Sequence, residues 1–186
     1  AQENGLQPLA DWLLTNLDPT VTSEEKAQEF ITEEVEDVET ALKGSHEIIA
    51  QYISDNAQYR EFIRKYVRYN AELVVKEKDV SKDPRKTYQL YYDFSLPVNN
   101  ARSYQVLAIN RGEREDVLSV SLKVDVAPIM NYMTRRTLKE ALPEAQKDLI
   151  VEAIEDSYRR FIGPAIEREI RNELTDQADE QAINVF

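Results

Sequence analysis

The feature that most constrains the fold is one strict alternation of side chains, in a chain that otherwise repeats its apolar residues at helical spacing. Within residues 117–126 apolar and polar side chains alternate, as in Leu118, Ser119 and Val120. This pattern is typical of an antiparallel strand with one face packed on helices and the other in water. Residues 73–76 break the helical period with β-branched side chains. We therefore expect a small two-stranded antiparallel ribbon that pairs residues 73–76 with 117–126.

Helical spacing of apolar residues covers most of the remaining chain. The helices it predicts lie at residues 6–17, at 22–44 in one or two pieces, at 45–54, 54–69, 84–94 and 102–111, and through the tail from 143. Proline and glycine set some of the limits: Pro19 ends the first helix, Gly44 separates two helices, and Gly163-Pro164 breaks or kinks the tail. Two strands are too few for a sheet domain, so the expected fold class is mostly α, a multi-helix scaffold with one small ribbon.

The chain is expected to contain two regions. Residues 1–142 form a helical region into which the ribbon is inserted, and residues 143–186 form long kinked helices. A chain of 186 residues can bury about 70% of the surface exposed by its unfolded form, which is enough for a core without metals or disulfides. It begins without methionine and stops within a helical pattern, so we expect it to be a piece of a longer protein.

The sequence lacks the residues that several kinds of functional site require. The chain has no cysteine, which excludes disulfides, thiolate metal sites and thiol nucleophiles. His46 is the only histidine, and we expect it to be structural or solvent-facing. The four glycines are scattered singly, so a glycine-rich phosphate loop cannot be assembled. We therefore expect no enzymatic activity, metal, cofactor or small-molecule substrate, and no apolar run reaches the roughly 20 residues that span a membrane.

Charge is distributed unevenly along the chain. The formal net charge is -12, which opposes attraction of the whole surface to nucleic acid or anionic lipid. Residues 1–59 carry 2 basic and 13 acidic side chains, residues 60–139 carry 16 and 10, and residues 140–186 carry 5 and 12. A basic middle thus separates two acidic flanks.

The basic middle contains one row of arginines. Arg60, Arg64 and Arg68 follow one another at intervals of four, which lines three guanidinium groups along one edge of a helix, with Lys65 beside them. These four residues are the predicted contacts with nucleic-acid phosphates, and the competing interpretation is a solvated helix face.

An aromatic pattern follows in the same part of the chain. Tyr88, Tyr91 and Tyr92 could stack bases, as aromatic side chains do in proteins that bind single strands. Basic neighbours accompany them, namely Lys82, Arg85 and Lys86. The helical spacing of the tyrosines favours packing in a core instead.

Five segments, in order, resemble the Tex family of bacterial transcription accessory proteins. They are Gly5–Ala10, Ala41–Ala50, Lys86–Ser95, Leu107–Val124 with its glycine-containing helix-to-strand corner, and the tail from Ile166. The sequence departs from the family where Arg102-Ser103-Tyr104-Gln105 replaces the common Pro-Ser-His-Arg, and where Asp116 replaces a glycine. We therefore carry no role of that His-Arg pair over to Tyr104 and Gln105, and the effect of this departure stays open.

The resemblance implies a function that composition and periodicity do not reach. It implies that the longer protein has a helix-turn-helix region, an RNase H-like domain after residues 143–186, helix-hairpin-helix elements and an RNA-binding OB-fold. This chain would be a helical scaffold in a cytoplasmic RNA-binding transcription accessory protein, contacting RNA or DNA mainly through those other parts. The alternative is a module that docks on the transcription machinery through its acidic first 59 residues.

Overall fold

A computed structural model describes residues 5–184 and divides them into two units. Unit 1 combines the chain up to Arg60 with Ala127–Gly163, and unit 2 combines Glu61–Val126 with the chain from Pro164. Each unit is therefore built from two stretches that are distant in the sequence. The expected division between residues 142 and 143 is a division along the chain, and it stays a prediction.

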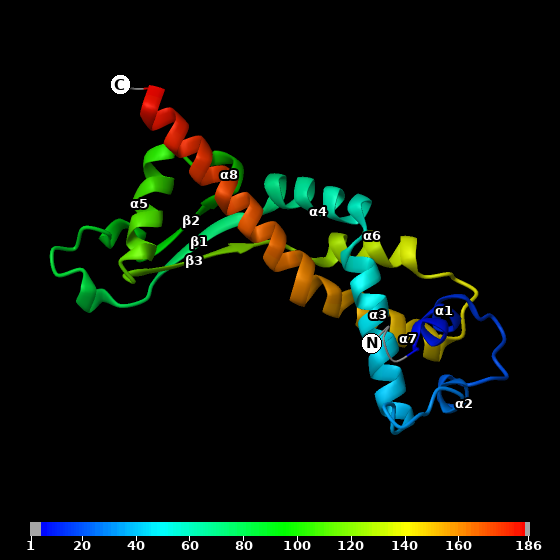
Figure 1. The fold of residues 1–186 in the computed structure, drawn as a ribbon. Coiled ribbons are helices and arrows are strands. Elements are labelled where there is room, and N and C mark those ends of the chain that lie inside the picture. Colours follow the sequence, from blue (N-terminus) through cyan, green and yellow to red (C-terminus); the bar gives the residue numbers. More distant parts are fainter. Residues whose placement is uncertain (1–4, 185–186) are drawn as a thin grey trace. The chain divides into compact units, whose positions relative to one another are not determined.

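Unit 1 is helical (Figure 1). Its helices are α1 (Gln7–Thr15), α2 (Ser23–Gln28), α3 (Val38–Ser54), the first residues of α4 (Ala57–Asn70), α6 (Ala127–Thr137) and α7 (Glu144–Ser157). Helix α3 packs against α7, α1 and α2. The core is largely aliphatic and includes Leu9, Leu13, Ile49, Ile53, Ile129, Met133, Ile150 and Ile154.

Side-chain caps fix where two of these helices begin. Thr22 accepts a hydrogen bond from the backbone N–H of Glu25, whose carboxylate accepts one from the N–H of Thr22, and this capping box starts α2. The Asp37 carboxylate accepts the N–H of Thr40 at 2.7 Å and starts α3. That backbone hydrogen bond lowers the pKa of Asp37 below its ordinary value.

The predicted helix boundary at Gly44 is wrong, because α3 continues through it to Ser54. The glycine serves packing instead. A Cβ at position 44 would clash with Cδ1 of Leu6, which is fully buried. Gly44 thus leaves room for Leu6, and the packing of the helix outweighs the cost of about 1 kcal/mol for one glycine in its interior.

Helical backbone continues through Gly163-Pro164, so no break occurs there, and the irregular part of the tail lies just before these residues. Tyr158–Ile162 form a π-helical turn, and α8 (Gly163–Asn184) starts directly after it with Pro164 in its first turn. None of the helices within residues 5–184 is long and apolar enough to cross a membrane.

Unit 2 contains a three-stranded antiparallel sheet in the order β2-β1-β3. The strands are β1 (Glu72–Glu77), β2 (Asp93–Pro97) and β3 (Leu118–Lys123), and the unit also holds α5 (Ser103–Arg114) and most of α4 and α8 (Figure 1). The predicted ribbon is confirmed by its register, with Leu73 opposite Leu122 and Val75 opposite Val120. The expectation of only two strands is wrong, because β2 pairs with the other side of β1.

The third strand replaces the end of a helix predicted at residues 84–94. Only a short 3-10 turn, Gln89–Tyr91, forms there, and β2 follows it. Asp83 explains the difference, because its carboxylate accepts the N–H groups of Thr87 and Tyr88 and the hydroxyl of Tyr92. These bonds hold the segment in a tight loop.

The corner between α5 and β3 contains a residue in the left-handed region. Asp116 has a φ of 62°, a conformation that favours glycine and that aspartate tolerates better than most residues. Its carboxylate accepts hydrogen bonds from Lys78 at 3.0 Å and Lys82 at 3.4 Å, and these lower the pKa of Asp116. The backbone at this corner thus suits the glycine that the resemblance leads one to expect there.

Candidate functional site

The predicted arginine row does not form one unpaired patch. Arg64 Nε lies 2.6 Å from Oε2 of Glu169, and Arg68 pairs in the same way with Glu173, both within unit 2. The hydrogen bond to Glu169 raises the pKa of Arg64, and the hydrogen bond to Glu173 raises that of Arg68. Two of the predicted phosphate contacts are thus already paired with carboxylates.

The other two members of the row have different surroundings. Arg60 belongs to unit 1, where its Nε and Nη2 atoms donate to the backbone oxygen and the hydroxyl of Ser54 at 2.5 and 2.9 Å. Lys65 is exposed and pairs with Glu61, one turn earlier, at 3.2 Å. Phosphate binding by this row stays a prediction.

The partners that the sequence did not predict lie on α8. Glu169 and Glu173 are four residues apart, as are Arg64 and Arg68, so two charged rows of opposite sign share one period. The matching period is the signal that could identify them. Nearby on the same helix, Glu167 Oε1 accepts the backbone N–H of Leu122 at 2.9 Å.

Helix α5 is also joined to α8 by polar contacts. Arg171 Nη2 donates to Glu113 Oε1 at 2.8 Å and to Asn110 Oδ1 at 3.0 Å. The amide of Asn110 donates in turn to the hydroxyl of Thr175 at 2.9 Å. Together with the pairs to α4 and the bond to β3, these contacts fasten α8 to three elements of unit 2.

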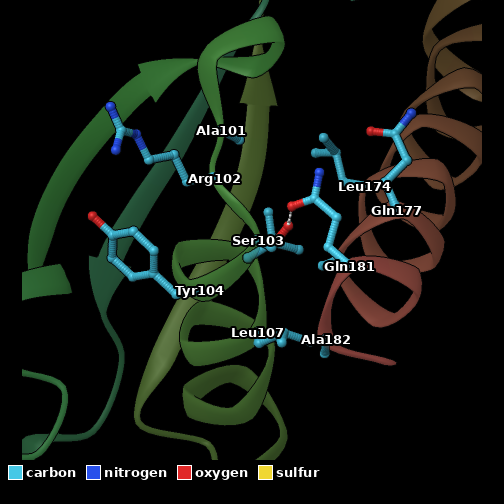
Figure 2. A pocket seen from close by; sticks show the side chains of 11 residues that line it. Ala101, Arg102, Ser103, Tyr104, Leu107, Leu174, Gln177, Gln181 and Ala182 are labelled. Atoms are coloured by element: carbon cyan, nitrogen blue, oxygen red, sulfur yellow. Dashed lines mark hydrogen bonds between the residues drawn. The ribbon is translucent and has the colours of Figure 1, made fainter. Parts of the chain in front are cut away.

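Two grooves lie along α5 and α8. The first, of about 590 Å³, is mainly apolar and includes Leu107, Leu174 and Ala182 (Figure 2). A hydrogen bond between Ser103 and Gln181 joins the two helices at this groove. The groove also contains Tyr104, which is 64% exposed.

The second groove, of about 510 Å³, is polar, and we call it the polar groove. Its charged lining residues are Glu113, Arg114, Glu167, Arg168 and Arg171, and its neutral polar ones are Asn110, Asn172 and Thr175. It lies near the C-terminal end of α5, where Arg114 is the last helical residue.

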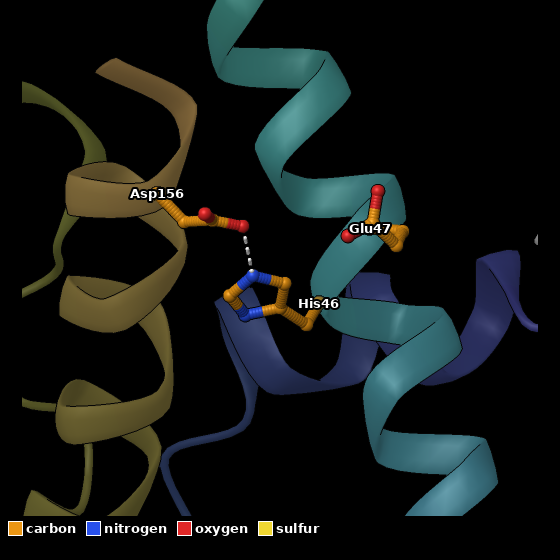
Figure 3. Close-up of side chains that lie close together, drawn as sticks. All are labelled: His46, Glu47 and Asp156. Atoms are coloured by element: carbon orange, nitrogen blue, oxygen red, sulfur yellow. Dashed lines mark hydrogen bonds and ion pairs between the residues drawn. The ribbon is translucent and has the colours of Figure 1, made fainter. Parts of the chain in front are cut away.

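The single histidine belongs to a cluster in unit 1 with Glu47 and Asp156 (Figure 3). His46 Nε2 lies 2.8 Å from Asp156 Oδ2. Arg160 contacts both carboxylates, and its Nη2 is 2.6 Å from Glu47 Oε1. Because a guanidinium group already bridges the acidic groups, this geometry favours an ion-pair network over a metal site.

The cluster stabilises a charge that is nearly buried. Asp156 is 9% exposed, and Arg159 also donates to it, at 2.8 Å. Hydrogen bonds from Arg160 first, and then from His46 and Arg159, hold the pKa of Asp156 well below its usual range despite burial. The hydrogen bond to Asp156 also raises the pKa of Arg160. The structural role expected for His46 agrees with this arrangement.

The tyrosines considered as a stacking platform serve the structure of the loop before β2. Tyr88 and Tyr91 are buried, which confirms the interpretation as core residues. Tyr92 is half-buried and donates its hydroxyl to Asp83 at 2.6 Å, which raises the pKa of Tyr92 to about 12. Burial raises the pKa of Asp83, but its hydrogen bonds outweigh that effect and lower it overall.

The comparisons with known proteins agree on one family. The family described as Tex central region-like matches residues 18–186. The chain is 38% identical to the uncharacterized protein YdcI of Bacillus subtilis over 189 residues, and 29% identical to the transcriptional accessory protein Tex of Neisseria gonorrhoeae over 191 residues. All of this chain is covered in both comparisons, but only 26% and 25% of those proteins.

A human protein is similar over a shorter stretch. The chain is 31% identical over 162 residues to the S1 RNA-binding domain-containing protein 1 of Homo sapiens, covering 77% of this chain and 16% of that protein. The chain therefore spans about a quarter of the length of these bacterial relatives and less of the human one.

Proposed function

Because the chain belongs to the Tex family, whose central region it matches, we propose that it is a helical scaffold that positions the nucleic-acid-binding parts of a longer protein. The proposal places RNA binding mainly outside these residues. The name of the human relative, which refers to an S1 RNA-binding domain, supports this division, since the chain corresponds to only 16% of that protein. We further propose a cytoplasmic location and no enzymatic activity.

The observation that carries the proposal is the attachment of α8. This helix has 22 residues and is about 33 Å long at 1.5 Å per residue. Ile166 and Ile170 are buried on its inner face. Glu167, Glu169 and Glu173 contact β3 and α4. An exposed ion pair contributes only about 0.2–1 kcal/mol, so the three polar contacts act chiefly by fixing the orientation of a helix that apolar burial holds in place.

A chimera tests the scaffold. We would replace the matching quarter of the Bacillus subtilis relative with this chain and measure the affinity of the full-length chimera for RNA by fluorescence anisotropy. We expect an affinity within about threefold of the relative. Replacing Glu167, Glu169 and Glu173 by glutamine should lower it at least about fivefold, because a loosened helix no longer holds the RNA-binding parts in a fixed arrangement.

The matched control is a chimera in which Asp176, Asp179 and Glu180 become asparagine or glutamine. These residues lie on the same helix, are exposed and carry the same charges. Equal RNA affinities in the two triple variants would contradict the scaffold.

The arginine row can be tested within the same proposal. If Arg64 and Arg68 contact phosphates, neutralising their partners with Glu169→Gln and Glu173→Gln frees two guanidinium groups. The isolated chain should then bind single-stranded RNA more tightly at low salt. An unchanged affinity would remove the row from the candidate phosphate contacts.

A second function is favoured by the charge of unit 1. Unit 1 contains 9 basic and 19 acidic residues, whereas unit 2 contains 14 and 16. Glu33, Glu34 and Glu36 are exposed in unit 1. Docking on the transcription machinery through this acidic surface would show as binding to purified RNA polymerase that weakens with salt. Reversal of these three glutamates to lysine should abolish it, and an insensitive interaction would count against this function.

A further inference from the structure

The polar groove between α5 and α8 contains two cations without carboxylate partners. Arg114 ends α5, Arg168 lies on α8, and both are exposed. Across residues 5–184, no ion pair or hydrogen bond engages either guanidinium group. Two unpaired arginines from different helices thus line one groove of about 510 Å³.

The acidic residues of the groove are already engaged. Glu113 accepts from Arg171 with both carboxylate oxygens, at 2.8 and 3.4 Å. Glu167 accepts the backbone N–H of Leu122. The groove residues whose charges have no partner, Arg114 and Arg168, are therefore both cations, although the chain as a whole carries a net charge of -12.

The groove is also held in shape by its own contacts. Asn110 receives a hydrogen bond from Arg171 and donates one to Thr175, which in turn donates to the backbone oxygen of Arg171. This network fixes α5 against α8. The side chains that would meet a ligand therefore start from a defined backbone frame.

The chemistry of the groove selects a polymer of phosphates. A guanidinium fork matches phosphate geometry and keeps its charge at any physiological pH. A single small anion gains little binding free energy from an ion pair with an exposed arginine, because water screens the attraction. A strand that places successive phosphates on both arginines gains from two contacts and from the release of its condensed counterions.

Charge density then favours one strand over two. A duplex carries a charge about every 1.7 Å along its axis, and a single strand about half as many. Because the chain is acidic overall, repulsion is smaller for the single strand. Unit 2, with 14 basic and 16 acidic residues, is the less acidic of the two units.

We propose that the polar groove binds the phosphate backbone of a single-stranded nucleic acid through Arg114 and Arg168. This site is separate from the arginine row on α4. The proposal rests on the proposed function in one respect, namely that the longer protein binds nucleic acid. It adds a direct contact with nucleic acid to a region that is otherwise proposed to be a scaffold.

The test measures binding of fluorescein-labelled RNA and DNA strands of about 12 nucleotides to the 186-residue chain by anisotropy, between about 50 and 300 mM salt. The Arg114→Gln, Arg168→Gln double variant should bind both strands at least about 10-fold more weakly at the lowest salt. The slope of log affinity against log salt should become shallower by about 1.4, the value for two phosphates on a single strand.

The control variant is Arg85→Gln with Lys86→Gln. These two cations are exposed, lie in unit 2 outside the groove, and change the net charge by the same amount. The control should lose less than about threefold in affinity. Melting temperatures of both variants should stay within about 3 °C of the unmodified chain, because neither guanidinium group of the groove has a paired carboxylate to lose.

Three results would overturn the inference. One is equal loss of affinity in the groove and control variants, which would mean a response to net charge alone. Another is displacement of the strand by poly-glutamate as readily as by unlabelled RNA, which would mean a site for carboxylates. The third is no measurable binding by the unmodified chain at the lowest salt. That result would leave the scaffold proposal in place, because the RNA affinity of the chimera tests the scaffold separately.

Discussion

Arg64 Nε on α4 lies 2.6 Å from Oε2 of Glu169 on α8, across a sequence separation of 105 residues. Arg68 and Glu173 are bonded across the same separation. The constant offset means that, within unit 2, α4 and α8 run in the same direction with their charged rows in register. Each pair therefore supports the geometry of the next.

The energy of this charged row is expected to be small and dependent on salt. A double-mutant cycle of Arg64→Ala and Glu169→Ala should give a coupling of about 0.5–1 kcal/mol at roughly 0.1 M salt, because the side chains are 28% and 40% exposed. Urea denaturation of the four proteins measures it. The coupling should fall when the salt is raised to about 1 M, and a coupling that is independent of salt would contradict an electrostatic origin.

Asp156 should make stability depend on pH. Its pKa is depressed in the folded chain, so its contribution to stability is fully present above the unfolded value of about 4 and is lost progressively as the pH falls toward the folded value. Asp156→Asn should lower the free energy of unfolding by about 3 kcal/mol at neutral pH, because Arg160 and His46 lose a nearly buried partner. The difference from the unmodified chain should shrink at about pH 3.

Asp148→Asn on the same helix is the control for this experiment. Asp148 is exposed, so its replacement should change the free energy of unfolding by no more than about 0.5 kcal/mol at either pH. A deficit of Asp156→Asn that is equally large in acid and at neutral pH would exclude the charge network as its cause.

Gly112 in the corner before β3 should not tolerate alanine. A Cβ at Gly112 would stand 2.8 Å from Cγ of Leu118 and closer still to its Cδ1, so Leu118 would have to move as a whole. Gly112→Ala should therefore destabilise the chain by about 1–2 kcal/mol, despite the better helix propensity of alanine. Thermal unfolding measures this cost, which should largely vanish when Leu118 is already alanine. An equal cost in both backgrounds would place the strain elsewhere.

The sheet illustrates how far the sequence predicts the fold. Alternation identifies β3 and its pairing with β1, because an antiparallel strand with one buried face leaves a period of two in the sequence. Strand β2 is not predicted, since the segment before it carries tyrosines at a spacing that resembles a helix. The loop there depends on Asp83 binding groups four to nine residues ahead, and these hydrogen bonds override local periodicity.

The sequence also predicts the candidate site only in part. The spacing of Arg64 and Arg68 is visible in the sequence, and so is the equal spacing of Glu169 and Glu173. The periodicity does not tell which two helices become neighbours. Opposite charges at intervals of four occur in many combinations in a chain with 35 acidic residues. The same holds for His46 and Asp156, which meet across 110 residues.

Spin labels test most directly whether α8 is held in one orientation within unit 2. The chain has no cysteine, so Glu61→Cys on α4 and Asp179→Cys on α8, both exposed, can be labelled selectively. Double electron–electron resonance should give one narrow distance distribution, which should broaden when Glu167, Glu169 and Glu173 are replaced by glutamine. A broad distribution in the unmodified chain, or one that the three replacements leave unchanged, would contradict the scaffold.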